Sequence, residues 1–250
     1  MGTLVSRGVS ILDASGPLPD AVLRYDKRPD ALVDVFLPDG PADTVVTFVH
    51  GGFWRAAYDR THVRPLARAL ADEGFAVTPP EYRRVGAGGG WPTTCDDVRA
   101  ALTATPTLLE DIGVTPRRTV LTGHSAGGHL VLWLAATGAS CDAVVPIAPV
   151  GDLRAAAAIG MGDGAVRDFL GGDEPVDAAD PAVLLDAHRP SYPVRILHGT
   201  DDDVVTIENS RGLVRRHPWI ELVELPDVDH FAPIDPASPV YPKLLGLLAE

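Results

Sequence analysis

The sequence contains little cysteine, little positive charge and no long apolar run, and each shortage excludes a class of protein. Cys95 and Cys141 are the two cysteines among the 250 residues, and neither lies at a spacing that would bind a metal. A disulfide-rich scaffold and a cysteine zinc site are therefore excluded. No apolar run reaches the roughly 18 residues that a membrane helix needs, and residues 1–20 contain no apolar segment of signal-peptide length. We expect a cytoplasmic protein with both thiols reduced, and a single disulfide between them is the alternative.

Positive charge is also scarce. Lysine and arginine total 21 against 34 aspartates and glutamates, which leaves a net charge of −13 at pH 7. A surface with this excess of negative charge repels phosphate groups, so neither nucleic acid nor an anionic membrane is an expected partner. The apolar share of 46 % and the charged share of 22 % are ordinary for a globular protein and exclude disorder.

Apolar segments with strand character alternate along the chain with helical patterns. The expected strands are Leu32–Leu37, Val45–Val49, Phe75–Thr78, Thr119–Thr122, Ala143–Ile147, Val194–Leu197 and Ile220–Glu224. The expected helices are His62–Glu73, Thr94–Glu110, Ala126–Thr137, Ile207–Arg216 and Pro239–Ala249. This alternation predicts an α/β protein with a mainly parallel sheet and helices on both faces. The turn Pro38–Gly40 predicts that the first two strands form an antiparallel start to that sheet.

Residues 151–190 interrupt the alternation. They are rich in Asp, Gly and Ala, with helical pieces and no clear strand. A plain connection is rarely that long. We predict a small cap-like insertion over one end of the sheet, within a single domain that comprises residues 1–250.

The most informative segment is Gly123–Gly127, GHSAG, which lies between a predicted strand and a predicted helix. The pattern G-x-S-x-G allows a strand to turn sharply into a helix, which exposes the serine hydroxyl at the edge of the sheet. It predicts Ser125 as a nucleophile. No lysine follows the glycines, so a phosphate-binding loop is not expected. His124 and His129 flank the serine and are expected to be structural.

A second glycine-rich loop, His50–Trp54 (HGGFW), follows the predicted strand Val45–Val49. Such a loop presents backbone N–H groups that can bind a developing oxyanion, together with the N–H of the residue after the nucleophile. We predict Gly52, Phe53 and Ala126 as these backbone donors, and His50 as a residue that supports the loop.

Five motifs together resemble the α/β-hydrolase fold family of serine esterases and amidases. They are HGGFW, EYRR, GHSAGGH, HGTDDDVV and a late Asp-His pair, and the resemblance extends from about residue 32 to the C-terminus. It implies an α/β-hydrolase fold: a mostly parallel central sheet with helices on both faces and a short insertion after the sixth strand.

One motif resembles a particular branch of that family. The order His-Gly-Gly-aromatic-Trp is similar to kynurenine formamidase (arylformamidase), whereas esterases related to hormone-sensitive lipase more often carry a third glycine where Phe53 stands. The branch implies hydrolysis of an aryl formamide.

The family places its acid after a strand that follows the insertion, and Val194–Leu197 is that strand. The family spacing H-G-x-x-D-x-x-V fits Asp202 with Val205. Asp203, and after it Asp201, are the alternatives. The chain contains nothing near these aspartates that resembles a calcium loop, so no metal is expected.

The base should lie between the last strand and the final helix, where His230 stands in the loop before Pro239–Ala249. His217 and His188 are alternatives, but His217 ends a helix just before a strand and His188 lies in the insertion. His230 is therefore the predicted base.

These residues predict a serine hydrolase that forms an acyl-enzyme on Ser125 and needs no cofactor. His230 would accept the serine proton, and Asp202 would orient and stabilise the imidazole. The predicted substrate is a small aryl formamide, with N-formylkynurenine the leading candidate, or a small ester. A carboxylesterase of other small esters, an acyltransferase on the same fold and a non-catalytic binding protein are the alternatives.

Aromatic residues are expected to contact this substrate, although packing is the alternative for at least half of them. They are Phe53, Trp54, Tyr82, Trp91 and Phe231. Arg83 or Arg84 could pair with a substrate carboxylate or with a surface acid. The oligomeric state cannot be predicted from these patterns.

Overall fold

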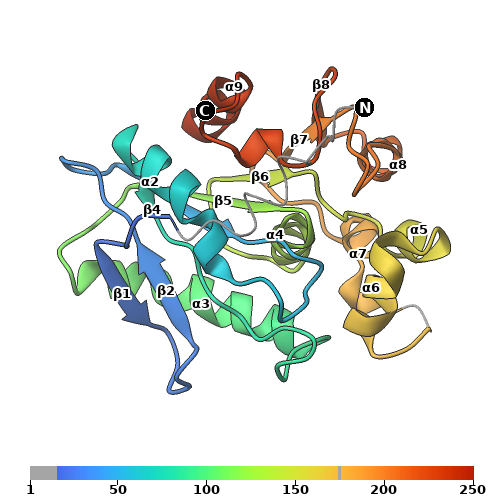
Figure 1. Ribbon diagram of the computed structural model, residues 1–250, viewed down its shortest axis with the longest axis horizontal. Helices are drawn as coiled ribbons and strands as arrows, with labels where there is room; N and C mark the ends of the chain where they lie inside the picture. Colours follow the sequence, from blue (N-terminus) through green and yellow to red (C-terminus); the bar gives the residue numbers. More distant parts are fainter. Residues whose placement is uncertain (1–15, 174–175) are drawn as a thin grey trace, which may run out of the picture.

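The computed structural model describes residues 16–173 and 176–250 and has a six-stranded parallel sheet at its centre (Figure 1). The strands of this sheet are β3 (Thr44–Val49), β4 (Ala76–Val77), β5 (Arg118–His124), β6 (Ala143–Ile147), β7 (Arg195–Gly199) and β8 (Glu221–Leu225). Their order is β4-β3-β5-β6-β7-β8, and all neighbouring pairs are parallel. The predicted parallel sheet is confirmed.

Helices cover both faces of the sheet because consecutive strand residues point to opposite sides. In β5, Val120 packs in one apolar core and Leu121 in the other, and Val145 and Val144 of β6 are divided in the same way. The near-continuous apolar runs of these strands therefore reflect burial on both faces. The helices are α2 (Arg64–Asp72) and α9 (Tyr241–Ala249) in one core, and α3 (Thr93–Glu110), α4 (Ala126–Ala136) and α8 (Glu208–Arg216) in the other.

The strand pairing predicted for the start of the sheet is wrong. β2 (Leu32–Val35) forms an antiparallel hairpin with β1 (Ala21–Arg24), and β4 lies between β2 and β3. An antiparallel bridge between Phe36 and Val77 joins the β2 segment to β4. The sequence does not reveal β1 because the strand has four residues and two of them are exposed.

The five predicted helices are present, each within two residues of its expected ends. The helix expected from His62 begins at Arg64, because a 3₁₀ turn capped by the Asp59 side chain precedes it. Cys95 and Cys141 are free thiols. Among the helices of residues 16–173 and 176–250, none combines the length and the apolar character that a bilayer crossing requires.

Residues 151–190, between β6 and β7, contain short helices that pack beside α4 (Figure 1). They are α5 (Leu153–Ala158), α6 (Met161–Leu170), η2 (Asp177–Ala179) and α7 (Pro181–Ala187). Two side chains of α4 fasten this segment: Trp133 Nε1–H donates to the Ala178 carbonyl at 2.9 Å, and His129 Nε2 donates to the Ala179 carbonyl at 2.9 Å. Burial lowers the pKa of His129 to about 4, so the ring is neutral.

The first turn of α4 packs directly against the backbone at the end of β3, with no side chain between them. A Cβ atom on Gly127 would lie 2.0 Å from the Val49 carbonyl oxygen and 2.5 Å from that of His50. Only glycine tolerates such an approach. Gly246 in α9 is a contrasting helical glycine, because an added Cβ there meets no atom of the described chain within 4 Å.

We predict that Gly127→Ala lowers the free energy of unfolding by about 1–3 kcal/mol or more, because backbone atoms must shift to admit the methyl group. Gly246→Ala should be neutral or stabilising by up to about 1 kcal/mol, since alanine favours a helix and has room there. Urea unfolding followed by circular dichroism measures both. Equal effects of the two substitutions would contradict the packing described for α4.

Candidate active site

Ser125 occupies a strained turn between β5 and α4. Its φ is +57° and its ψ is −118°, a conformation that costs a non-glycine residue about 1–3 kcal/mol. Its N–H donates to the Ile147 carbonyl at 2.9 Å, which ties the turn to the end of β6. A Cβ on Gly123 would lie 2.5 Å from the Gly127 carbonyl oxygen, so the glycines on both sides of the serine are required by close backbone packing.

His230 lies in the loop after β8, and its imidazole bonds to a carboxylate on one side. Its Nδ1 lies 2.6 Å from Oδ2 of Asp202. Because a carboxylate only accepts, Nδ1 carries the proton and Nε2 of the neutral ring is left as an acceptor. His124 holds the base against the serine turn: its Nε2 donates to the His230 carbonyl at 2.9 Å, and the two ring centres are 4.3 Å apart.

The Asp202 carboxylate is buried and has four donors. Oδ1 accepts the N–H groups of Val204 at 2.9 Å and Val205 at 2.8 Å, while Oδ2 accepts from His230 and, at 3.2 Å, from Nε2 of His198. Burial raises the pKa of Asp202, but the two histidines outweigh burial and hold the pKa well below its ordinary value. Asp202 is therefore an anion at neutral pH.

The neighbouring aspartates have different surroundings. Asp201 and Asp203 are exposed, and the Asp201 side chain accepts from the Thr200 hydroxyl at 3.3 Å. Of the three consecutive aspartates, the structure brings Asp202 to His230.

His198 is a site residue that the sequence reasoning missed. Its Nε2 donates to the Val205 carbonyl at 2.8 Å as well as to Asp202, and the Ser210 hydroxyl lies 2.8 Å from its Nδ1. Both partners of Nε2 are acceptors, so Nε2 carries a proton, and the Ser210 hydroxyl is the polar partner of Nδ1. The signal was present as the histidine of the H-G-x-x-D spacing, four residues before the aspartate.

The loop His50–Trp54 turns back against the serine. φ is +107° at Gly52, +52° at Phe53 and +56° at Trp54, and the Arg55 N–H closes the turn on the Gly52 carbonyl at 3.0 Å. A Cβ on Gly51 would lie 3.1 Å from Cβ of Ser125, so the loop contacts the serine turn directly.

The three predicted oxyanion donors lie around this contact. Within the described chain, the N–H groups of Gly52 and Phe53 donate no hydrogen bond to a backbone or side-chain acceptor. Ala126 is the first residue of α4, where helical N–H groups have no partner inside the helix. All three N–H groups therefore remain available to a ligand oxygen.

The His50 side chain contacts the oxyanion loop and two residues outside it. Its Nδ1 lies 2.9 Å from the Gly51 carbonyl oxygen and its Nε2 lies 3.2 Å from Oε1 of Glu81, and the Tyr82 ring stacks on the imidazole at 4.2 Å.

The predicted substrate aromatics are not all near the serine. Trp54 is fully buried and stacks on Phe169 at 4.6 Å, and Tyr82 is fully buried under His50. Their surroundings assign both to packing, contrary to the predicted substrate contact. Trp91 packs edge-on against Trp133, with ring centres 5.9 Å apart. Trp133 lies about two helical turns along α4 from Ser125.

Phe231 and Phe53 do lie beside the site. The partly exposed Phe231 ring is 4.9 Å from the His230 ring, and the Phe53 ring lies over Gly162, where an added Cβ would come within 2.5 Å of it.

The two candidate arginines form ion pairs with carboxylates of the protein. Arg83 binds Asp97 at 2.7 Å, and Arg84 binds Glu81 at 3.3 Å. Their pairing with a substrate carboxylate would require these ion pairs to break.

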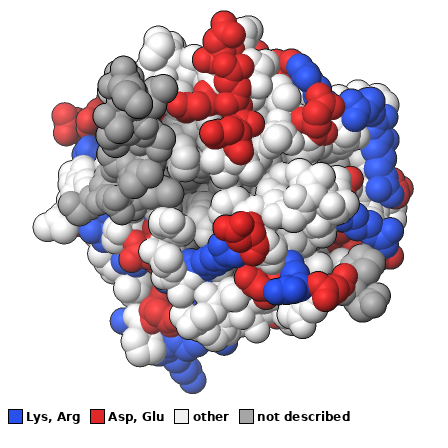
Figure 2. Space-filling model, turned by 45° about the vertical axis from the view of Figure 1, so that its right-hand side comes forward, with Lys and Arg blue, Asp and Glu red and all other residues white. Residues whose placement is uncertain are grey.

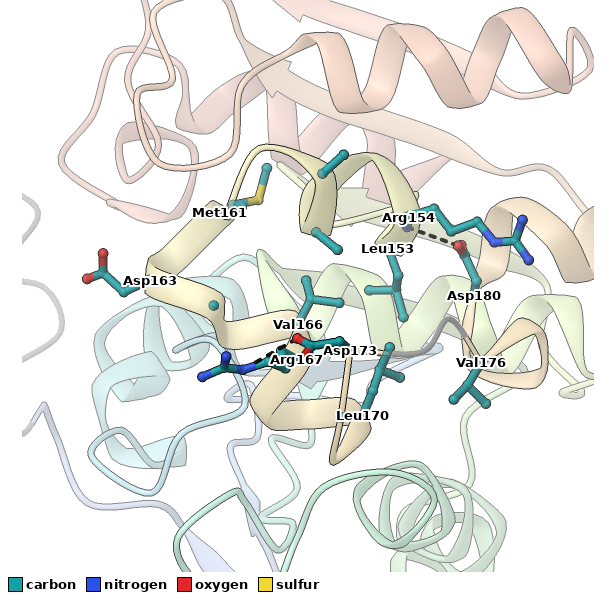
Figure 3. A pocket seen from close by; sticks show the side chains of 15 residues that line it. Leu153, Arg154, Met161, Asp163, Val166, Arg167, Leu170, Asp173, Val176 and Asp180 are labelled. Carbon is teal, nitrogen blue, oxygen red and sulfur yellow. Dashed lines mark hydrogen bonds and ion pairs between the residues drawn. The ribbon is translucent and has the colours of Figure 1, made fainter.

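A cavity of about 730 Å³ lies within the insertion rather than at the serine (Figure 3). Its described lining residues all lie between Leu153 and Asp180, and the apolar side chains of Leu153 and Val166 point towards each other across it. The turn Met161–Gly164 separates this cavity from the Phe53 ring.

The molecular surface is mixed in charge on the face shown in Figure 2. Acidic side chains gather at the top of this view and basic ones at its upper right edge, with uncharged areas between them.

Comparison with known sequences relates the chain to esterases. Residues 33–216 match the family model BD-FAE. The probable carboxylic ester hydrolase LipM of Mycobacterium tuberculosis is 28 % identical over 191 residues, which are 66 % of this chain and 43 % of LipM. The carboxylesterase NlhH of the same species is 31 % identical over 115 residues, 45 % of this chain and 36 % of NlhH. The chain thus spans less than half the length of these two relatives.

Solved structures share the fold at low identity. Esterase B from Lactobacillus rhamnosis superposes with a TM-score of 0.79 at 20 % identity, covering 98 % of this chain and 90 % of that one. Esterase 2 of Thermogutta terrifontis gives a TM-score of 0.74 at 22 % identity, covering 92 % of each chain. The chain therefore has the α/β-hydrolase fold, and it belongs to the BD-FAE family.

Proposed function

We propose that this protein is a serine carboxylesterase that cleaves small esters through an acyl-enzyme on Ser125. The observation that carries the proposal is the 2.6 Å bond between His230 Nδ1 and Asp202, which leaves Nε2 as a base on a ring that contacts His124, the residue before the strained Ser125. The names of LipM and NlhH support an ester as substrate.

Each group has a defined role in the proposed reaction. His230 Nε2 takes the proton of Ser125 Oγ as the oxygen attacks the ester carbonyl, and the imidazolium that forms is stabilised by Asp202. The N–H groups of Gly52, Phe53 and Ala126 bind the resulting oxyanion. His230 then protonates the leaving alcohol, and water repeats the sequence to release the acid.

The geometry also favours a short acyl group. Phe53 carries one of the proposed oxyanion donors on its backbone, and its ring packs against Gly162 in the Met161–Gly164 turn. We propose that residues 151–190 act as a small cap, and that Phe53 and this cap together restrict the space for the acyl chain.

An aryl formamide, such as N-formylkynurenine, is the finer alternative for the substrate. Formyl is the shortest acyl group, and the motif HGGFW, which resembles the arylformamidase branch, carries Phe53 at the restricted position. The two substrate classes differ in the leaving group, since one releases an alcohol and the other an aryl amine.

Replacement of the nucleophile is the first test. Ser125→Ala should lower kcat for p-nitrophenyl acetate by at least about 10³-fold, because no other group can form the acyl-enzyme. A fluorophosphonate should label the native protein on Ser125 and leave the variant unlabelled, as mass spectrometry would show. Turnover by the folded variant within tenfold of the native rate would refute the proposal.

The three adjacent aspartates provide a matched series for the acid. Asp202→Asn should reduce kcat by about 10⁴-fold, the loss found for the same change in a serine-protease triad, because the amide favours the wrong histidine tautomer. Asp201→Asn and Asp203→Asn should stay within about threefold of the native rate, since neither side chain contacts His230. A larger loss at either exposed position would assign the acid elsewhere.

Acyl-chain preference tests the restricted site. Specificity constants for p-nitrophenyl esters should fall from acetate to decanoate, because a longer acyl chain must displace the Phe53 ring or the cap. Methylenes that stay in water also gain none of the roughly 0.8 kcal/mol that burial of each would provide. Phe53→Gly should flatten this decline. A specificity constant that rises towards decanoate in the native protein would contradict the restricted site.

N-formylkynurenine measured beside these esters decides between a formamide and an ester as substrate. Added methanol reveals any acyl transfer, because the methyl ester would form in place of the free acid.

A further inference from the structure

The imidazole of His50 faces an acceptor at each of its two nitrogens. Nδ1 is 2.9 Å from the Gly51 carbonyl oxygen and Nε2 is 3.2 Å from Oε1 of Glu81, and the side chain is fully buried. The Tyr82 hydroxyl lies 3.4 Å from Nδ1, but it donates its proton to the His50 carbonyl at 2.8 Å, so it too presents an oxygen lone pair to the ring. A carbonyl oxygen and a carboxylate can only accept hydrogen bonds. A neutral imidazole carries a single N–H and would leave one of these contacts without a proton.

The Glu81 carboxyl group cannot supply the missing proton. Every described partner of its oxygens is a donor: besides His50, they are the N–H groups of Tyr82 and Arg60 and the guanidinium groups of Arg60 and Arg84. A protonated carboxyl group could donate only to His50 Nε2, whereas the other four donors, two of them guanidinium groups, all favour the charged carboxylate. Burial raises the pKa of Glu81, but His50 and the arginines outweigh it and lower the pKa to about 2.

The remaining groups around the ring also suit a cation. The Tyr82 ring is stacked on the imidazole with an interplanar angle of 13°, which places a π face against it. His62 approaches edge-on with ring centres 5.6 Å apart, and burial lowers the pKa of His62 to about 4. His62 is thus neutral, and no second charged imidazole competes with His50.

The contact at Nδ1 acts on the oxyanion loop through a peptide bond. In a trans peptide the carbonyl oxygen and the following N–H point in opposite directions. A donor that holds the Gly51 carbonyl on one side therefore directs the Gly52 N–H to the other side, where the loop meets Ser125. A positive charge on that donor also polarises the peptide and strengthens its N–H as a donor.

We propose that His50 is a buried imidazolium, held in that state by the Glu81 carboxylate, and that it strengthens the Gly52 N–H as an oxyanion donor. His50 and Glu81 are positioning residues, because they act through the Gly51–Gly52 peptide. The inference rests on the proposed function, which makes the Gly52 N–H an oxyanion donor. Since charge appears on the substrate oxygen only during reaction, the pair should affect kcat more than KM.

Glu81→Gln tests the pair, because the amide oxygen can still accept from His50 but carries no charge. We expect kcat for p-nitrophenyl acetate to fall about 10–100-fold, part of the loss known for removing a whole oxyanion donor, with KM within about twofold. Asp34→Asn is the matched control: Asp34 is a buried carboxylate bonded to Arg60 and Arg64 and makes no hydrogen bond or ion pair to a histidine in the described chain. Its kcat should stay within about threefold, and a native kcat in Glu81→Gln would overturn the inference.

The protonation state can be read without any activity. In ¹⁵N-histidine-labelled native protein at pH 7, both ring nitrogens of His50 should carry protons, with its signals assigned by their loss in His50→Gln. In Glu81→Gln one of these protons should be lost. A single protonated nitrogen on His50 in the native protein would overturn the inference even if no variant folds. Absence of esterase turnover would instead refute the proposed function and leave this measurement intact.

Discussion

The close approach of three backbone segments is the constraint on which the site depends. The end of β3, the end of β5 and the start of α4 meet at Gly123 and Gly127, with no room for a side chain between them. This contact forces the chain through the strained conformation of Ser125 and places the loop after β3 against the serine. The nucleophile and the oxyanion loop are brought together by backbone packing, so their geometry does not depend on flexible side chains.

The site contains two buried carboxylate–histidine pairs, Asp202–His230 and Glu81–His50, which differ in their other partners. Asp202 accepts from two histidines and two backbone N–H groups, and it leaves His230 with a free nitrogen. Glu81 accepts from His50 and from arginines, while the other nitrogen of His50 is already bonded to a carbonyl. The first arrangement produces a neutral ring that can accept a proton, and the second produces a ring that keeps both of its protons.

Helix α4 links the site to the segment between β6 and β7. All eleven of its residues are buried, because the sheet covers one side and the helices of residues 151–190 lie on another. A helix in this position has no polar face. Its two side-chain donors, His129 and Trp133, donate to backbone carbonyls of residues 151–190. Burial keeps His129 neutral, which suits a residue that joins two parts of the fold.

Local features of the fold could be predicted from the order of the amino acids. Strand–helix alternation indicated the parallel sheet and five helices, because apolar periodicity reflects burial directly. The spacing GHSAG indicated the turn at Ser125, since the glycines it requires are neighbours in the chain. The short, half-exposed β1 left no such pattern.

Features that depend on contacts between distant residues could be assigned only from the folded chain. Asp201, Asp202 and Asp203 are alike in composition, and the one that meets a histidine 28 residues later is selected by the path of the β7 and β8 loops. Trp54 and Tyr82 read equally well as binding or packing residues until their neighbours, Phe169 and His50, were in place. The role of a polar or aromatic side chain is set by its partners in space, and local sequence does not encode them.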